Sequence, residues 1–172
     1  MALDKRHLLA QLRGHYEQRL ASARRSELDA RDGARTAATE SEKKEDGRVA
    51  IELNGLANGQ ARRQHAMKAE LDQLDALCTK PLPVYRDGSR AGLLALVDVG
   101  LDHEDGEREE RTFFVLPFGA GTELTGPGGD GFISVITPAS PVGRAIVGKR
   151  AGDDAEIQLE RGSCELVVLE VA

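Results

Sequence analysis

The chain has 172 residues, of which 40% are hydrophobic but only 3% aromatic, and this suits one small aliphatic domain, alone or joined to an extended element. Residues 1–80 hold 15 Lys and Arg against 13 Asp and Glu, residues 81–172 hold 8 against 16, and the formal net charge is −6. Because phosphates repel carboxylates, the acidic second half argues against duplex nucleic-acid binding there and is compatible with docking on a basic protein surface.

Two further features restrict the class of protein. Cys78 and Cys164 are far apart and lack CxxC spacing, which favours reduced thiols over a disulfide framework or a metal site. No apolar run approaches the length of a membrane span, and the N-terminus lacks the apolar region of a signal peptide. We therefore expect a soluble, cytoplasmic protein without a membrane partner.

The first half has the periodicity of two long helices. From Leu3 to Ala38 there is no Pro, and apolar or small residues repeat at 3–4 spacing with one charged interruption, Glu27. A second periodic run extends from Leu53 to Cys78 and ends before Pro81. Neither helix could bury its apolar stripe alone. The pattern therefore predicts an antiparallel helical hairpin, a short coiled coil.

The end of the hairpin nearest the turn is the least regular part. Both runs become rich in Ala and Gly there, which would let the two backbones approach closely. The pairs Asn54-Gly55 and Asn58-Gly59 leave open a β-turn or a break in the second helix.

Residues 39–47, between the two runs, form an acidic tip with four carboxylates and two lysines. Glu42 and Glu45 are three residues apart, so on a nascent helix they share one face and could help hold Mg²⁺, given further ligands. There is a structural alternative. Thr39 and Glu42 fit a capping box, and acidic side chains in a first turn complement the helix dipole. Spacing alone favours this alternative.

The second half predicts a compact β-rich domain. A loop over residues 119–131 contains six Gly, but it has neither a Gly-Lys-Ser/Thr end nor a GxGxxG entering a helix, so it is a connection rather than a phosphate site. The predicted strands cover residues 92–101, 111–118, 132–137, 155–159 and 164–171.

The segment Ser140–Lys149 (SPVGRAIVGK) combines a Ser-Pro turn with a short helix over residues 143–147, ended by Gly148. We expect its aliphatic side chains to enter the core and three other side chains to be available for surface contact. The core candidates are Val142, Ile146 and Val147, and the surface candidates are Ser140, Pro141 and Arg144.

This segment resembles the signature of the C-terminal domain of the bacterial transcript-cleavage factors GreA and GreB. In that family a Ser-Pro turn leads into Gly/Ala-Arg-Ala, two aliphatic residues and Gly-Lys. The tip run Glu42–Asp46 is similar to the family's Asp-x-Lys-Glu-Asn motif, with Glu42 at the position that is usually Asp. The resemblance implies an α+β fold, with an antiparallel coiled-coil hairpin over residues 1–80 and an FKBP-like antiparallel β domain with a short helix over residues 81–172.

The resemblance also implies a function. Such a protein would bind bacterial RNA polymerase through Ser140, Pro141 and Arg144, and it would insert the hairpin through the secondary channel. Glu42 and Glu45 would then assist the polymerase active site, sharing its Mg²⁺ while backtracked RNA is hydrolysed near its 3′ end. The protein would be a monomer, a cofactor of an enzyme rather than an enzyme, with no cofactor of its own.

Three alternative functions remain open at this point. A related factor could occupy the channel and inhibit or modulate transcription, since Glu42 replaces Asp and the tip carries the extra acids Glu40 and Asp46. A peptidyl-prolyl isomerase would need an aromatic-lined site, and the second half has only five aromatic residues. A freestanding coiled-coil interaction protein would explain the first half of the chain but not the second.

Overall fold

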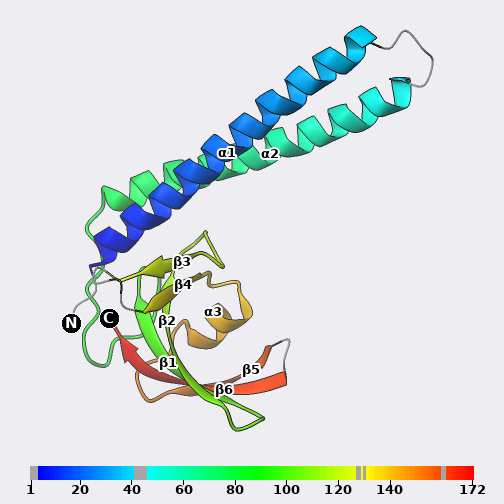
Figure 1. Ribbon diagram of the computed structural model, residues 1–172. Coiled ribbons are helices and arrows are strands. Elements are labelled where there is room, and N and C mark those ends of the chain that lie inside the picture. The colour runs from blue at the N-terminus through cyan, green and yellow to red at the C-terminus, as the bar shows by residue number, and fades with distance from the viewer. Residues whose placement is uncertain (1–3, 41–45, 127–128, 130, 160–161) are drawn as a thin grey trace. The chain divides into compact units, whose positions relative to one another are not determined.

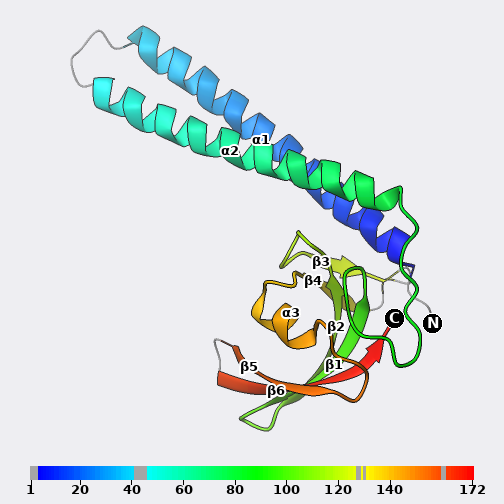
Figure 2. The same cartoon turned by 180° about the vertical axis from the view of Figure 1, so that it is seen from behind.

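The computed structural model describes residues 4–40, 46–126, 129, 131–159 and 162–172 (Figures 1 and 2). For residues 30–40, 46–58 and 159 it describes the backbone alone. The chain divides into two compact units, and each is described by itself. One unit is Arg13–Leu77, and the other joins Cys78–Ala172 to the chain up to Leu12. The elements in order are α1 (Lys5–Glu40), α2 (Asp46–Cys78), β1 (Leu96–His103), β2 (Arg108–Val115), β3 (Glu123–Thr125), β4 (Phe132–Ile136), α3 (Pro141–Ile146), β5 (Asp154–Leu159) and β6 (Gly162–Val171).

Cross-helix contacts show that α1 and α2 run antiparallel, as predicted. Arg13 Nε lies 3.1 Å from a carboxylate oxygen of Asp75. Fourteen residues further along α1, Glu27 accepts a 2.9 Å hydrogen bond from the side-chain amide of Gln64. The partner's number falls as the α1 number rises, which is the order of a hairpin. Figures 1 and 2 show the two helices side by side.

The predicted apolar stripes meet in the seam between these helices. Tyr16 and Leu74 are buried, and the neighbouring seam positions are half-buried. The one charged interruption in the first stripe, Glu27, is matched by the polar Gln64 of the second stripe. Cys78 was expected in the seam as well, but it is exposed, because it is the last residue of α2.

Both helices continue close to the tip. The two Asn-Gly pairs lie inside α2, so the β-turn or break that the sequence left open is not present there. Thr39 lies inside α1, whose last residue is Glu40, and therefore it does not cap α2. Glu42 and Glu45 lie outside the described residues. No described helix is apolar over a stretch long enough to cross a membrane.

The second unit is built on a six-stranded sheet with the order β3-β4-β2-β1-β6-β5. All neighbouring strands are antiparallel except β2 and β4, which are parallel. The sheet is therefore mixed, and the expectation of a wholly antiparallel sheet was wrong at this pair. Two parallel neighbours cannot be joined by a tight hairpin, and here the chain passes through β3 between them.

Two of the predicted strand assignments change in the structure. Residues 92–95 do not extend β1, because Leu94 has a φ of 66° and the chain turns there. The Gly-rich connection contains a short strand, β3, which pairs with β4 over three residues. The remaining predicted strands are present, with shifted ends.

One face of the sheet packs against α3 and forms the main core. This face receives aliphatic side chains from β1, β2 and β6, with Ile146 of α3 fully buried among them. Cys164 lies in this core as a free thiol, and burial raises its pKa. Val142 and Ala145 pack against the edge of the core. The alternation of β-strand side chains leaves the other face of the same strands without this core.

The start of α1 is part of the β unit. The side-chain oxygen of Gln11 accepts a 3.1 Å hydrogen bond from the backbone N–H of Thr125 in β3, and the Gln11 amide donates to the Thr125 carbonyl. Leu8 and Leu12, which lie beside Gln11 on the same helix face, are fully buried. The chain thus divides at residues 77/78, but its first turns group with the sheet. The domain boundary predicted at 80/81 remains a prediction.

Candidate functional site

The Ser140–Lys149 segment is organised by its first residue. Ser140 is the N-cap of α3, and its hydroxyl accepts a 3.0 Å hydrogen bond from the backbone N–H of Gly143. The same hydroxyl donates to the carbonyl of Thr137 at 2.7 Å. Pro141 follows at the first helical position, where its missing N–H has no intrahelical partner to lose. Ser140 is therefore committed to capping, a role that leaves little of its hydroxyl for a partner.

Gly143 is required by a close backbone approach. A Cβ at this position would lie 1.9 Å from the carbonyl oxygen of Thr137, far inside any allowed contact. Gly143 is also buried, and its backbone N–H donates the hydrogen bond that the capping hydroxyl of Ser140 accepts. The glycine in this motif lets the first turn of α3 lie directly on the preceding backbone.

The end of the segment is fixed by residues much earlier in the chain. Gly148, with a φ of 87°, donates its N–H to the Ala91 carbonyl at 2.8 Å, and Ala91 donates in return to Lys149. The Arg90 guanidinium donates to the Gly148 carbonyl at 2.8 Å. The segment is thus held at both ends, which makes α3 a rigid support for its outward side chains.

Three side chains spaced by three residues face outward here, and we call Pro141, Arg144 and Val147 the α3 surface. All three are exposed, and Val147 is 39% exposed. Val147 was expected in the core; it is the C-cap of α3, and its extended backbone turns it outward. Within the described part of the chain, the Arg144 side chain has no hydrogen bond or ion pair. The α3 surface therefore offers an unpaired cation between two apolar side chains.

Comparisons with known proteins find a match to this domain. Residues 97–172, which include α3 and five of the strands that support it, match the family model "Transcription elongation factor, GreA/GreB, C-term". Residues 97–172 are thus similar to the C-terminal domain of the GreA/GreB transcription elongation factors. The match confirms the resemblance of the Ser140–Lys149 segment and covers the β unit from β1 to the C-terminus.

The matches to individual relatives extend over only part of each protein. The transcription elongation factor GreA of Streptococcus suis is 37% identical over 88 residues, which are 51% of this chain and 50% of that protein. GreA of Streptococcus pneumoniae is 32% identical over 68 residues, 40% of this chain and 38% of that protein. The chain thus spans half, or less, of the length of these curated relatives.

Solved structures include the GreA factor homolog Gfh1 of Thermus thermophilus. It is 21% identical, with 93% of this chain and 94% of that chain covered and a TM-score of 0.36.

The predicted site residues fall into two separate groups. Ser140, Pro141 and Arg144 lie together around the first turn of α3, although only the last two are exposed. Glu42 and Glu45 lie outside the described residues, between the end of α1 and the start of α2. Among the described residues, no cluster of His, Cys, Asp and Glu could hold a metal ion. The sequence did not predict the roles of Arg90 and Ala91. Nothing in the local pattern indicates that these residues contact the Ser140–Lys149 segment.

The contact at Gly143 gives the first prediction. Gly143→Ala should lower the free energy of unfolding of the β unit by at least about 2 kcal/mol, because the new methyl group must displace the Thr137 backbone. Alkylation of the buried Cys164 at increasing urea concentrations measures this, with the exposed Cys78 as internal reference. The matched control is Gly59→Ala, where an added Cβ would meet no neighbouring group within 4 Å. This control should leave unchanged the urea concentration at which Cys164 becomes half-alkylated. An unchanged midpoint for Gly143→Ala would contradict the packing described here.

Proposed function

We propose that this protein binds bacterial RNA polymerase through the α3 surface and stimulates the polymerase's own cleavage of backtracked RNA. The observation that carries the proposal is the GreA/GreB domain over residues 97–172, with Pro141 and Arg144 exposed on a rigidly held α3. In this account the protein is a cofactor of an enzyme. The β unit supplies binding, and the hairpin tip supplies the groups that act at the polymerase active site.

The chemistry of the α3 surface suits a protein partner. A guanidinium without an internal ion pair can bind a partner's carboxylate with two parallel hydrogen bonds. Pro141 and Val147, on either side of Arg144, add apolar contact area. Because α3 is fixed at both ends, binding would cost little ordering of this segment. We infer that the partner presents an acidic group within an apolar surface.

The hairpin has the length needed to reach a site distant from the docking domain. α1 has 36 residues and α2 has 33. At 1.5 Å per residue, each helix is roughly 50 Å long. Three contacts hold the two helices together. They join Tyr16 to Glu70, Arg13 to Asp75 and Glu27 to Gln64. A helical pair of this length can carry a short acidic tip through a narrow channel.

The tip carboxylates have the chemistry for a shared metal site. Glu42 and Glu45 offer the hard oxygen ligands that Mg²⁺ prefers, but two carboxylates alone leave most of its coordination positions to other ligands. The metal would therefore be that of the polymerase active site, where bound Mg²⁺ lowers the pKa of water and stabilises developing charge. Glu42 and Glu45 would position a water molecule and the RNA 3′ end.

A second function keeps the same partner without the cleavage. Glu42 is one methylene longer than the Asp that is usual in the family, and metal positioning tolerates little displacement. A factor with this tip could occupy the secondary channel and inhibit or modulate transcription. The two functions make different predictions for the tip variants below.

The docking prediction concerns Arg144. Arg144→Glu should weaken binding to RNA polymerase by about tenfold or more, since it replaces an unpaired cation by an anion at the centre of the α3 surface. Fluorescence anisotropy of labelled protein with core polymerase measures the affinity. The control Arg86→Glu makes the same charge change on an exposed turn and should change affinity less than about threefold. Equal losses for both variants would show that net charge, and not the α3 surface, governs binding.

The tip prediction separates chemistry from helix stability. Glu42→Ala and Glu45→Ala should each abolish stimulation of RNA cleavage by a stalled polymerase while leaving polymerase affinity within about twofold. Glu40→Ala and Asp46→Ala, which change the same charge beside the tip pair, should retain most of the stimulation.

Three outcomes would contradict parts of this account. Equal effects from all four acids would indicate a diffuse negative tip. No stimulation by the unmodified protein, with recovery in Glu42→Asp, would favour the channel-occupying alternative. No polymerase binding at all would reject both functions.

A further inference from the structure

The sheet has a second face, opposite α3, on which carboxylates gather. The strand register places Asp98 beside Glu170, Asp102 beside Glu165, and Glu165 beside Glu156. Residues paired across adjacent strands point to the same face, so these carboxylates share one side of the sheet. We call this side the acidic sheet face; it comprises Asp98, Asp102, Glu110, Asp154, Glu156, Glu165 and Glu170, with Val167 among them. Leu169 is unpaired in the register, and it lines the same side together with Gly100 and Val167.

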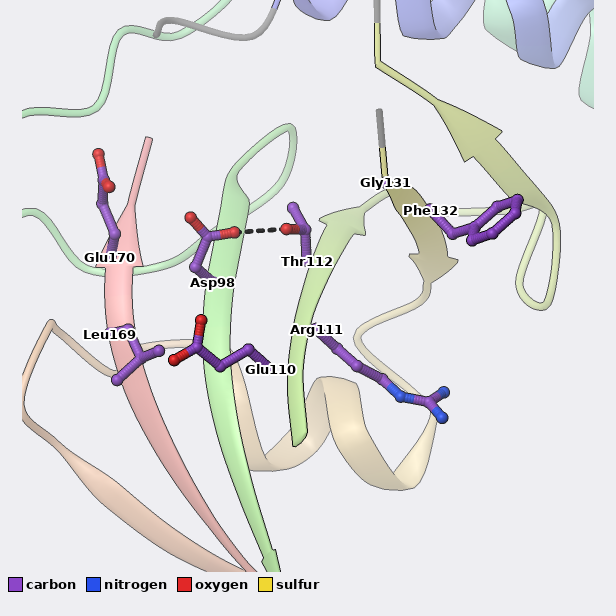
Figure 3. Close-up of a pocket in the computed structure, with 8 residues that line it drawn as sticks. All are labelled: Asp98, Glu110, Arg111, Thr112, Gly131, Phe132, Leu169 and Glu170. Carbon is purple, nitrogen blue, oxygen red and sulfur yellow. Dashed lines mark hydrogen bonds between the residues drawn. The ribbon is translucent and has the colours of Figure 1, made fainter. Parts of the chain in front are cut away.

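The centre of the acidic sheet face is apolar and uncovered. Leu169 is 46% exposed, and Val167 beside it is half-buried. Gly100, which pairs with Val167, has no side chain to cover them; a Cβ there would lie 3.9 Å from a methyl carbon of Leu169. Figure 3 shows Leu169 below Glu170 on β6 and beside Glu110, with α3 behind the strands. These three residues line a hollow of the sheet.

The charges on this face are largely uncompensated. Arg108 is paired with Asp102 through two hydrogen bonds, the longer of 3.0 Å. Asp98 accepts a 2.6 Å hydrogen bond from the Thr112 hydroxyl (Figure 3). In the described part of the chain, Asp98, Glu110 and Glu170 have no ion pair. Arg111, which also lines the hollow, forms an ion pair with Glu109, and the distance from its guanidinium nitrogen to the carboxylate oxygen is 3.1 Å.

An open antiparallel sheet face is commonly polar and solvated, and it then carries charges of both signs. This face differs in two respects: its charge is nearly all of one sign, and its centre is aliphatic. The sign excludes a nucleic-acid partner, because phosphates would be repelled. The complement of the face is a segment that presents Lys or Arg side chains around an aliphatic stripe.

We propose that the acidic sheet face is a second protein-binding surface, which docks a basic amphipathic peptide segment of a partner. The aliphatic stripe of that segment would lie over Val167, Leu169 and the uncovered Gly100. Its Lys and Arg side chains would pair with Glu110, Glu170 and the surrounding carboxylates. The α3 surface lies on the other side of the sheet, so the two surfaces can be occupied independently. This inference does not depend on the proposed function at the polymerase.

The test uses the full chain and a synthetic probe. The probe is a fluorescent peptide of Leu and Lys, patterned as an amphipathic helix, and its reference is a peptide of the same composition in scrambled order. Fluorescence anisotropy should show the patterned peptide binding about tenfold more tightly than the scrambled one. The variant Glu110→Lys/Glu170→Lys should weaken that binding about tenfold or more, and Leu169→Ser several-fold.

A matched charge control keeps the proposal falsifiable. Asp87→Lys/Glu107→Lys makes the same change in net charge at exposed turns outside the acidic sheet face, and it should change affinity less than about threefold. Circular dichroism confirms that each variant is folded. The proposal is overturned if the control weakens binding as much as the face variant, if Leu169→Ser has no effect, or if patterned and scrambled peptides bind alike. It is also overturned if the unmodified chain binds neither peptide.

Discussion

The position of α3 depends on the carbonyl oxygen of Thr137. This oxygen accepts hydrogen bonds from the Ser140 hydroxyl at 2.7 Å and from the Ser140 N–H at 3.0 Å, and it stands where a side chain at residue 143 would begin. Only glycine can occupy position 143 without moving that backbone. The capped, closely packed first turn then sets which side chains of the helix enter the core and which face outward. The exposure of Pro141 and Arg144 follows from this one contact.

The two faces of the sheet in the β unit differ in chemistry. One face buries Ile146 and the aliphatic side chains of the central strands, so α3 is supported by the main core. The opposite face carries most of its charge as carboxylates around Leu169. A domain of this kind presents a cationic helix on one side and an acidic sheet on the other. In the proposed function the hairpin supplies length rather than contact area.

The sequence predicted what depends on local periodicity. The 3–4 spacing of small and apolar residues predicted both long helices, and Ser-Pro followed by Gly predicted the turn into α3. The parallel pairing of β2 with β4 is a long-range arrangement that strand composition does not encode, and β3 is too short to show alternation. Val147 was misplaced because its hydrophobicity predicted burial, whereas its backbone leaves the helix there.

The site could be predicted only in part for similar reasons. Arg144 and Pro141 were identifiable from the motif, and the structure exposes both. Ser140 was predicted as a contact residue, but its hydroxyl is taken up by two backbone groups, as is expected of an N-cap. The anchoring of Gly148 by Ala91 joins segments 57 residues apart in the chain, and no local pattern indicates it.

The central claim is that the hairpin tip reaches the metal of the polymerase active site while the β unit stays outside. Replacing that metal with Fe²⁺ in the complex and adding peroxide generates hydroxyl radicals that cut the nearest polypeptide. Mass spectrometry of the fragments then locates the cut in this chain. The account predicts cleavage confined to residues 39–47, and none when the polymerase is omitted. Cleavage in the β unit, or none in the chain although the complex forms, would contradict it.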